Sequence, residues 1–173
     1  MIILGGNYLY SRIKKHIIMS YLDIKSKDIE PIVKELNTLL ADYNLYYQNL
    51  RGYHWNVSGK NFFDLHIKFE ELYTDARIKI DEIAERILTL RHNPTSEFSK
   101  YFEMSSIKGT SSLISDTEMV KHILDQHEIL LKQMSKVVKK AESAGDEGTI
   151  DMIGGYIGSI EKVSWMLDAW TKE

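Results

Sequence analysis

Hydrophobic residues recur along this chain at spacings of three and four, which is the pattern of amphipathic helices. The longest such stripe comprises Phe62, Leu65, Phe69, Leu72, Ala76, Ile80, Ile83 and Ile87. An earlier stripe comprises Ile32, Leu36, Leu40, Tyr43, Tyr47 and Leu50. Two further stripes lie within residues 120–137 and 150–167. The pattern therefore predicts four long helices.

Residues that start or stop helices set the limits of the first two. The chain has only two prolines, Pro31 and Pro94, so long uninterrupted helices are possible. We expect the first helix to begin near Asp28, with Pro31 in its first turn, and to end before the Val-Ser-Gly sequence at 57–59. The second helix is expected at about 61–90, ahead of Pro94.

The second half of the chain carries clear cap signals. Ser115-Asp-Thr-Glu118 is a capping-box sequence, and it predicts a helix that extends to about Ala144. Gly145 and Asp146 are suited to end that helix and to begin the last one, at about 147–170. We expect residues 95–115 to form a long crossover that contains a short helix. The predicted fold class is all-α, a four-helix bundle of the ferritin-like type.

The first twenty residues differ from the remainder. They contain Arg12, Lys14, Lys15 and His16 and no acidic residue. We expect residues 1–20 to form a basic N-terminal tail, either disordered or the result of a mis-assigned start upstream of Met19. Residues 21–173 are expected to form the bundle, because a chain of this length can bury one full core.

Composition narrows the chemistry. The chain is 43% hydrophobic and 27% charged, as is usual for a globular protein, and its net charge of −3 does not indicate nucleic-acid binding by the chain as a whole. The absence of Cys excludes disulfides, thiol catalysis and thiolate metal sites. Histidine and carboxylate remain as strong ligands, which suit iron, zinc or manganese. No apolar run reaches the roughly 20 residues of a membrane span, so we expect a cytoplasmic protein.

Four candidate ligands follow one edge of the second predicted helix. His66 and Glu70 are four residues apart, as are Asp81 and Glu85, so each pair projects from one face. The step of eleven from Glu70 to Asp81 returns to within roughly 20° of the same direction. This edge lies about 130° from the centre of the apolar stripe and therefore faces solvent or another subunit.

Distance prevents the two pairs from sharing a metal ion within one chain. Glu70 and Asp81 are about 16 Å apart along the helix axis, whereas metal–ligand bonds are about 2.0–2.2 Å long. Two copies of the helix, packed antiparallel about a two-fold axis, would bring pair against pair. The alternative is that these are ordinary charged residues on a helix surface. His54 lies on the extension of the first stripe, where a histidine is more often a core or interface residue than a ligand.

A missing motif separates two kinds of bundle. Ferritin-like proteins with a di-iron site inside the bundle use Glu-x-x-His pairs that point inward. No Glu-x-x-His sequence occurs in this chain. The sequence therefore predicts an apolar interior, with its candidate ligands on the outer edge.

The segment from Asn49 to Leu90 closely resembles the Dps family of mini-ferritins. It contains a His-Trp pair, then Phe-Phe-x-Leu-His, then Asp-Glu-x-Ala-Glu-Arg, in the family's order and spacing. Two later stretches, ESAGDEGT at 142–149 and EKVSWML at 161–167, are also similar to the family. The resemblance covers about residues 22–170.

The resemblance implies an iron-oxidation site with two iron positions between two-fold related subunits. One chain would supply His54, His66 and Glu70, and its partner would supply Asp81 and Glu85. The family typically has Asp where this chain has Glu70. The resemblance further implies that the protein oxidises Fe(II), preferably with hydrogen peroxide, and stores ferric oxide in a hollow dodecamer. It also implies that the protein protects DNA.

Two more roles follow from the resemblance alone. Trp55 would lie near the site and intercept radicals, although it could simply be a large interface aromatic. Asp146, Glu147 and Asp151 would surround three-fold pores and attract cations, whereas helix capping is the alternative for Asp146.

Two other functions remain open at this stage. The first is a structural protein that binds and compacts DNA, with weak or no ferroxidase activity, through a basic tail that contains Arg12, Lys14, Lys15, Lys25 and Lys27. The second is a zinc-binding hydrolytic bundle, because histidine and carboxylate also suit zinc. It ranks far lower, since no general base beside an open zinc position is recognisable.

Overall fold

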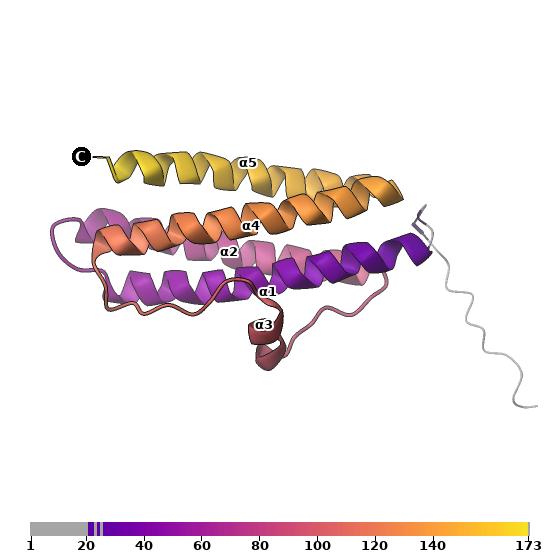
Figure 1. Ribbon diagram of the computed structural model, residues 1–173, viewed down its shortest axis with the longest axis horizontal. Helices are drawn as coiled ribbons and strands as arrows, with labels where there is room; N and C mark the ends of the chain where they lie inside the picture. The colour runs from indigo at the N-terminus through magenta and orange to yellow at the C-terminus, as the bar shows by residue number, and fades with distance from the viewer. Residues whose placement is uncertain (1–20, 23, 25, 173) are drawn as a thin grey trace, which may run out of the picture.

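The computed structural model describes residues 21–172 except 23 and 25, and over these residues it is all-α (Figure 1). Its helices are α1 (Ser26–Asn56), α2 (Phe62–Thr89), α3 (Phe98–Met104), α4 (Asp116–Ala144) and α5 (Glu147–Trp170). The predicted four long helices and the short helix in the crossover are confirmed. The predicted basic tail, residues 1–20, lies outside the described residues.

The chain direction explains the long crossover. α1 and α2 form an antiparallel pair, and α4 and α5 form another, as Figure 1 shows. The segment after α2 returns along the bundle before α4 begins, so α2 and α4 run in the same direction. On this return path α3 lies against α1.

The helix ends follow the cap signals with one exception. Ser115 and Glu118 form the complete capping box of α4, and Gly145 ends that helix with φ at 70°. α1, however, begins at Ser26. Pro31 therefore lies beyond the first turn, although the sequence predicted it within that turn. Asp28 is in that first turn, where a carboxylate stabilises the positive end of the helix dipole.

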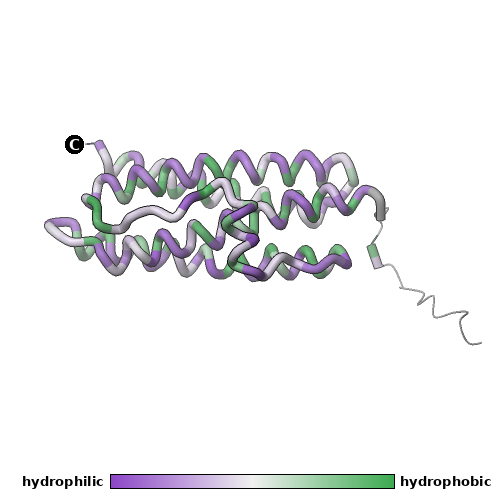
Figure 2. The backbone as a smooth tube through the Cα atoms, turned by 60° about the horizontal axis from the view of Figure 1, so that its bottom comes forward, coloured by the Kyte–Doolittle hydropathy of each residue, from purple (hydrophilic) through white to green (hydrophobic). Residues whose placement is uncertain are grey.

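The core is built from the inward stripes of the four long helices. Hydrophobic and hydrophilic residues alternate along each helix with the helical period, as Figure 2 shows. The largest fully buried side chains include Tyr43, Leu50, Phe69 and Ile83. Within the α2 stripe, Phe62 and Ile80 are only half-buried, whereas Ile87 near the end of the helix is fully buried. Burial of these stripes is the main favourable term in forming the bundle.

A polar triad crosses this interior, so the expectation of an apolar interior was wrong in part. Tyr46 of α1 lies 2.7 Å from Nε2 of His127 in α4, and His127 Nδ1 lies 2.8 Å from Ser164 Oγ in α5. Ser164 donates its own hydroxyl hydrogen to the Ile160 carbonyl, so it accepts from His127. The triad satisfies its buried polar atoms by connecting three helices, which a periodicity argument cannot detect.

A second buried contact fixes the crossover on α1. Asp42 is fully buried and accepts hydrogen bonds from the Ser105 hydroxyl and the Ser106 amide, at 2.7 and 2.8 Å. Asn37 accepts a bond of 2.7 Å from the Thr95 amide at the start of the crossover. These bonds hold both ends of α3 against α1.

The triad predicts an acid-dependent loss of stability. Burial, and then the nearby Lys79 cation, lower the pKa of His127 from 6.5 to about 4. Between these values the unfolded chain binds a proton that the folded chain does not bind. The free energy of unfolding should therefore fall as pH decreases from 6.5 to 4, by about 1.4 kcal/mol per pH unit.

Urea unfolding at a fixed protein concentration, repeated across this pH range, tests the prediction. His127→Gln keeps groups that can bond Tyr46 and Ser164 but does not titrate, so it should show a shallower pH slope than the parent. His122→Gln, a half-buried position of the same helix, is the control and should keep the parent's slope. Equal slopes in all three proteins would contradict the assignment.

Candidate metal centre

Two histidines meet where α1 and α2 join. His54 lies in the last turn of α1, and His66 lies near the start of α2, after a loop in which Gly59 adopts φ of 100°. His54 Nδ1 is 2.8 Å from the His66 carbonyl oxygen, and His66 Nδ1 is 2.9 Å from the His54 carbonyl oxygen. The rings are stacked with centroids 3.8 Å apart. The sequence predicted both residues but not this exchange of bonds.

The exchange fixes the tautomer that each ring adopts when it is neutral. A carbonyl oxygen can only accept, so Nδ1 of each histidine must carry the hydrogen. Nε2 of each ring is then left with a lone pair, which is the form that binds a metal ion. Hydrogen bonds of this kind orient metal-binding histidines in general. The two imidazoles are therefore prepared as ligands before any metal arrives.

Glu70 belongs to the same cluster through Tyr73. The Tyr73 hydroxyl donates to Glu70 Oε1 at 3.3 Å, and the Tyr73 ring meets the His54 ring edge-on at 5.3 Å. Desolvation, and then the Glu70 carboxylate, raise the pKa of Tyr73, so its phenol stays protonated and can donate. On the other side, Phe62 stacks on His66 at 4.9 Å. Sequence reasoning missed Tyr73, although its position three residues after Glu70 could have indicated it.

Asp81 and Glu85 lie elsewhere on α2. Both are exposed, and neither side chain has a hydrogen bond or ion pair with the rest of the described chain. Residues 21–172, apart from 23 and 25, contain no group of three or more His, Asp or Glu side chains that could hold a metal ion. One chain thus brings His54 and His66 together, with Glu70 connected to His54 only through Tyr73, and Asp81 and Glu85 lie apart.

Trp55 lies at the surface beside this cluster. Its side chain is 59% exposed, and the Arg51 guanidinium lies over its ring at 4.7 Å. The same guanidinium lies 5.3 Å from the Tyr47 ring. A cation between two aromatic rings is a stable surface arrangement. It is compatible with both roles considered for Trp55.

Asp146 is not available for a pore, which corrects one expectation. It is buried, caps α5 by accepting from the Thr149 amide, and forms an ion pair with Arg86 of α2. Arg86 also donates to the Thr149 hydroxyl at 2.9 Å. Gly148 allows this approach, because a Cβ there would lie 3.1 Å from the guanidinium. Helix capping thus explains Asp146, whereas Glu147 and Asp151 are exposed.

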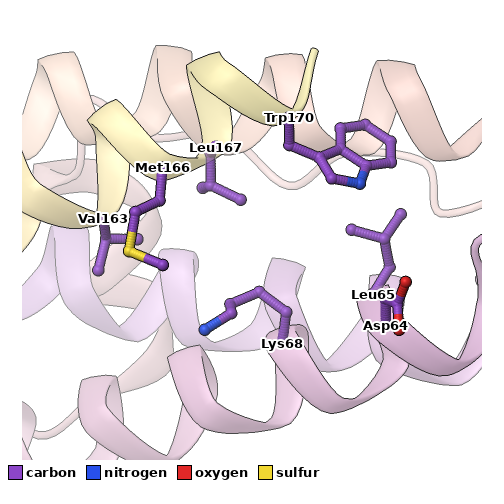
Figure 3. Close-up of a pocket in the computed structure, with 7 residues that line it drawn as sticks. All are labelled: Asp64, Leu65, Lys68, Val163, Met166, Leu167 and Trp170. Atoms are coloured by element: carbon purple, nitrogen blue, oxygen red, sulfur yellow. The ribbon is translucent and has the colours of Figure 1, made fainter. Parts of the chain in front are cut away.

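An apolar hollow lies between α2 and α5, away from these residues (Figure 3). It is lined by Asp64, Leu65, Lys68, Val163, Met166, Leu167 and Trp170. The lining contains one carboxylate and no histidine, so it does not offer a ligand set for a metal ion.

Within the described residues, no helix combines the length and the apolarity that crossing a bilayer requires.

Known proteins with similar sequences cover most of this chain. Residues 33–173 match a family model described as a ferritin-like domain. The DNA protection during starvation protein of Porphyromonas gingivalis is 39% identical over 153 residues, which span 88% of this chain and 96% of the relative. DNA protection during starvation protein 2 of Bacillus anthracis is 37% identical over 142 residues, which span 82% and 97% of the two chains.

Solved structures agree with the sequence relatives. The Dps protein of Vibrio cholerae O1, described as a member of a broad superfamily of ferritin-like diiron-carboxylate proteins, superimposes with a TM-score of 0.84 and 44% identity over 86% of this chain and 94% of that one. Dps from Staphylococcus aureus gives a TM-score of 0.80 and 36% identity over 83% and 97%. The predicted ferritin-like fold is confirmed. The chain belongs to the Dps family of ferritin-like proteins.

Proposed function

We propose that this protein is an iron-storing ferroxidase whose active sites form between two chains. His54, His66 and Glu70 of one chain bind iron together with Asp81 and Glu85 of its partner. The observation that carries the proposal is the exchange of hydrogen bonds between His54 and His66, at 2.8 and 2.9 Å, which leaves both Nε2 atoms ready for a metal.

The ligand set of one chain is incomplete for iron oxidation. Two imidazoles and the Glu70 carboxylate suit Fe(II), but Fe(III) requires more negative charge. Asp81 and Glu85 are exposed carboxylates on the same helix with no partner in the described part of their own chain. Their addition would stabilise Fe(III) and so favour oxidation.

The positions along α2 define how two copies would meet. In an antiparallel pair, Glu70 faces Asp81 and His66 faces Glu85 about the same two-fold axis, between residues 75 and 76. That axis also sets Phe63 opposite the partner's Leu88, and both residues are exposed in the single chain. Exposed apolar residues that flank a candidate site are typical of an interface. The two-fold packing would thus bury these residues and complete two sites.

The reaction balances with two iron ions at each site. Each Fe(II) gives one electron, and two electrons reduce one hydrogen peroxide molecule to two hydroxide ions, so no hydroxyl radical is released. We propose hydrogen peroxide as the preferred acceptor and a hollow dodecamer as the store for the ferric oxide. Removal of both iron and peroxide would protect DNA, in agreement with the names of the two relatives, which are DNA protection during starvation proteins.

The alternative of a DNA-compacting protein gains no support from the structure. It depends on basic residues of the N-terminal segment, and Arg12, Lys14, Lys15 and Lys25 lie outside the described residues, as does the side chain of Lys27.

Removal of the partner's carboxylates should abolish most of the activity. In Asp81→Ala with Glu85→Ala, the bundle should fold as in the parent, since both side chains are exposed. Iron oxidation should slow by on the order of 100-fold, as expected when ligands are lost. The measurement is ferric absorbance after anaerobic protein is mixed with Fe(II) and half an equivalent of hydrogen peroxide.

The control, Asp64→Ala with Glu71→Ala, removes two exposed carboxylates of α2 from outside the site and should oxidise iron normally. Parental rates in the first variant would contradict the site.

Mixed oligomers test whether each site combines two chains. Neither His54→Ala with His66→Ala nor Asp81→Ala with Glu85→Ala should be active alone. Co-assembled at equal amounts, half of the two-fold pairs combine one chain of each kind, and each such pair has one complete site. About a quarter of the parent's activity should then return, from the symmetry of the pair. Activity that stays at the level of the separate variants would show that the sites are not shared.

A further inference from the structure

A buried tyrosine and histidine form a proton donor–acceptor pair in the bundle interior. Tyr46 is 3% exposed and His127 is 1% exposed. Because His127 Nδ1 donates to Ser164, His127 Nε2 has a free lone pair and accepts the Tyr46 hydroxyl hydrogen at 2.7 Å. The lowered pKa of His127 keeps the imidazole neutral at pH 7. The iron reaction proposed above makes no use of this pair.

Tyr43 provides a comparison within the same helix. It is also buried, and its ring meets the Tyr46 ring edge-on at 6.2 Å. Its hydroxyl oxygen, however, has no hydrogen-bond partner among the described residues. A phenol becomes a strong acid when it loses an electron, so oxidation is favourable only where a base can take the proton. Tyr46 has such a base, and Tyr43 has none.

Neighbouring aromatic rings lead from His54 through Tyr73 to Tyr47, which is next to Tyr46 in α1. The Tyr73 ring is 5.3 Å from the His54 ring and 6.1 Å from the Tyr47 ring. Tyr47 directly follows Tyr46 in the chain. Along α1, Tyr46 and His54 are about 12 Å apart at roughly 1.5 Å per residue, a separation over which proteins transfer single electrons. Tyr73 itself is less suited to be the oxidised residue, because its hydrogen-bond acceptor, Glu70, is a proposed iron ligand.

We propose that Tyr46 and His127 act as a redox pair that supplies an electron when hydrogen peroxide meets a site holding a single Fe(II). The inference rests on the proposed ferroxidase function. Such a site would otherwise reduce peroxide by one electron and release a hydroxyl radical.

The electrons and protons of the step balance. Fe(II) gives one electron and becomes Fe(III), and the Tyr46 phenol gives the second, which cleaves the O–O bond and yields two hydroxide ions. The Tyr46 proton moves to His127 Nε2, which leaves a neutral phenoxyl radical beside an imidazolium. A later Fe(II) returns an electron to Tyr46, and the proton moves back from His127. Burial keeps the radical away from solvent in the interval.

Freeze-quench electron paramagnetic resonance provides the test. Assembled protein loaded with one Fe(II) per site is mixed with one equivalent of hydrogen peroxide, and ferric formation is followed in parallel. The parent should give a phenoxyl signal. Tyr46→Phe, which keeps the ring, should reduce that signal at least tenfold, whereas Tyr43→Phe should retain it. His127→Gln can still accept a hydrogen bond but not a proton, and it should also lose most of the signal. Circular dichroism and the oligomer size establish that each variant is folded.

The outcomes separate this proposal from the ferroxidase function. If ferric iron forms and the phenoxyl signal is equally strong in Tyr46→Phe, or absent from the parent, the redox pair is wrong while the ferroxidase stands. If no ferric iron forms, the ferroxidase is wrong. Flash-generated one-electron oxidant applied to iron-free protein then tests the pair alone. A radical that depends on Tyr46 and His127 but not on Tyr43 supports the pair, and any other pattern overturns it.

Discussion

The short length of a metal–ligand bond is the physical constraint that determines how the proposed site must be built. Such a bond is about 2 Å long, whereas Glu70 and Asp81 are about 16 Å apart along α2. No side-chain movement closes that distance, because α2 is a continuous helix from Phe62 to Thr89. A centre that uses both carboxylates must therefore combine two chains. With two-fold symmetry, α2 then contributes ligands to both halves of each proposed site, and α1 adds His54.

The remainder of the fold serves to hold the halves rigid. His54 and His66 come from different helices, and each ring is oriented by the backbone carbonyl of the other, so the α1–α2 hairpin cannot shift without losing both bonds. Arg86 fixes the far end of α2 to the start of α5 through Asp146 and Thr149. α2 is thus secured at both ends, while Asp81 and Glu85 on its outer edge stay exposed, as the proposed two-chain site requires.

The bundle interior has a different chemistry from that of proteins with a di-iron site between the four helices. Two of its buried polar pairs, Tyr46 with His127 and Asn49 with Gln126, form hydrogen bonds between helices. A neutral imidazole that accepts from a phenol and donates to Ser164 has no lone pair left for a metal. In this arrangement His127 therefore does not bind iron.

Periodicity and caps were enough to predict the helices, because those signals are local. The stripe through Phe69 and Ile83 and the capping box at Ser115 required only neighbouring residues. The burial of His127 and the ion pair of Asp146 depend on which turns of different helices face each other, so local patterns do not predict them. The bond from Tyr73 to Glu70 lies within α2 and was within reach of a spacing argument. Pro31 shows the limit of such signals, because α1 begins at Ser26 and the proline lies beyond its first turn.

The most direct measurement is anomalous diffraction from crystals of the assembled protein soaked anaerobically in Fe(II). Iron peaks should lie within about 2.0–2.2 Å of Nε2 of His54 and His66, with Glu70 from the same chain and with Asp81 and Glu85 from its two-fold partner. Iron held by residues of a single chain, or bound away from all five side chains, would contradict this prediction.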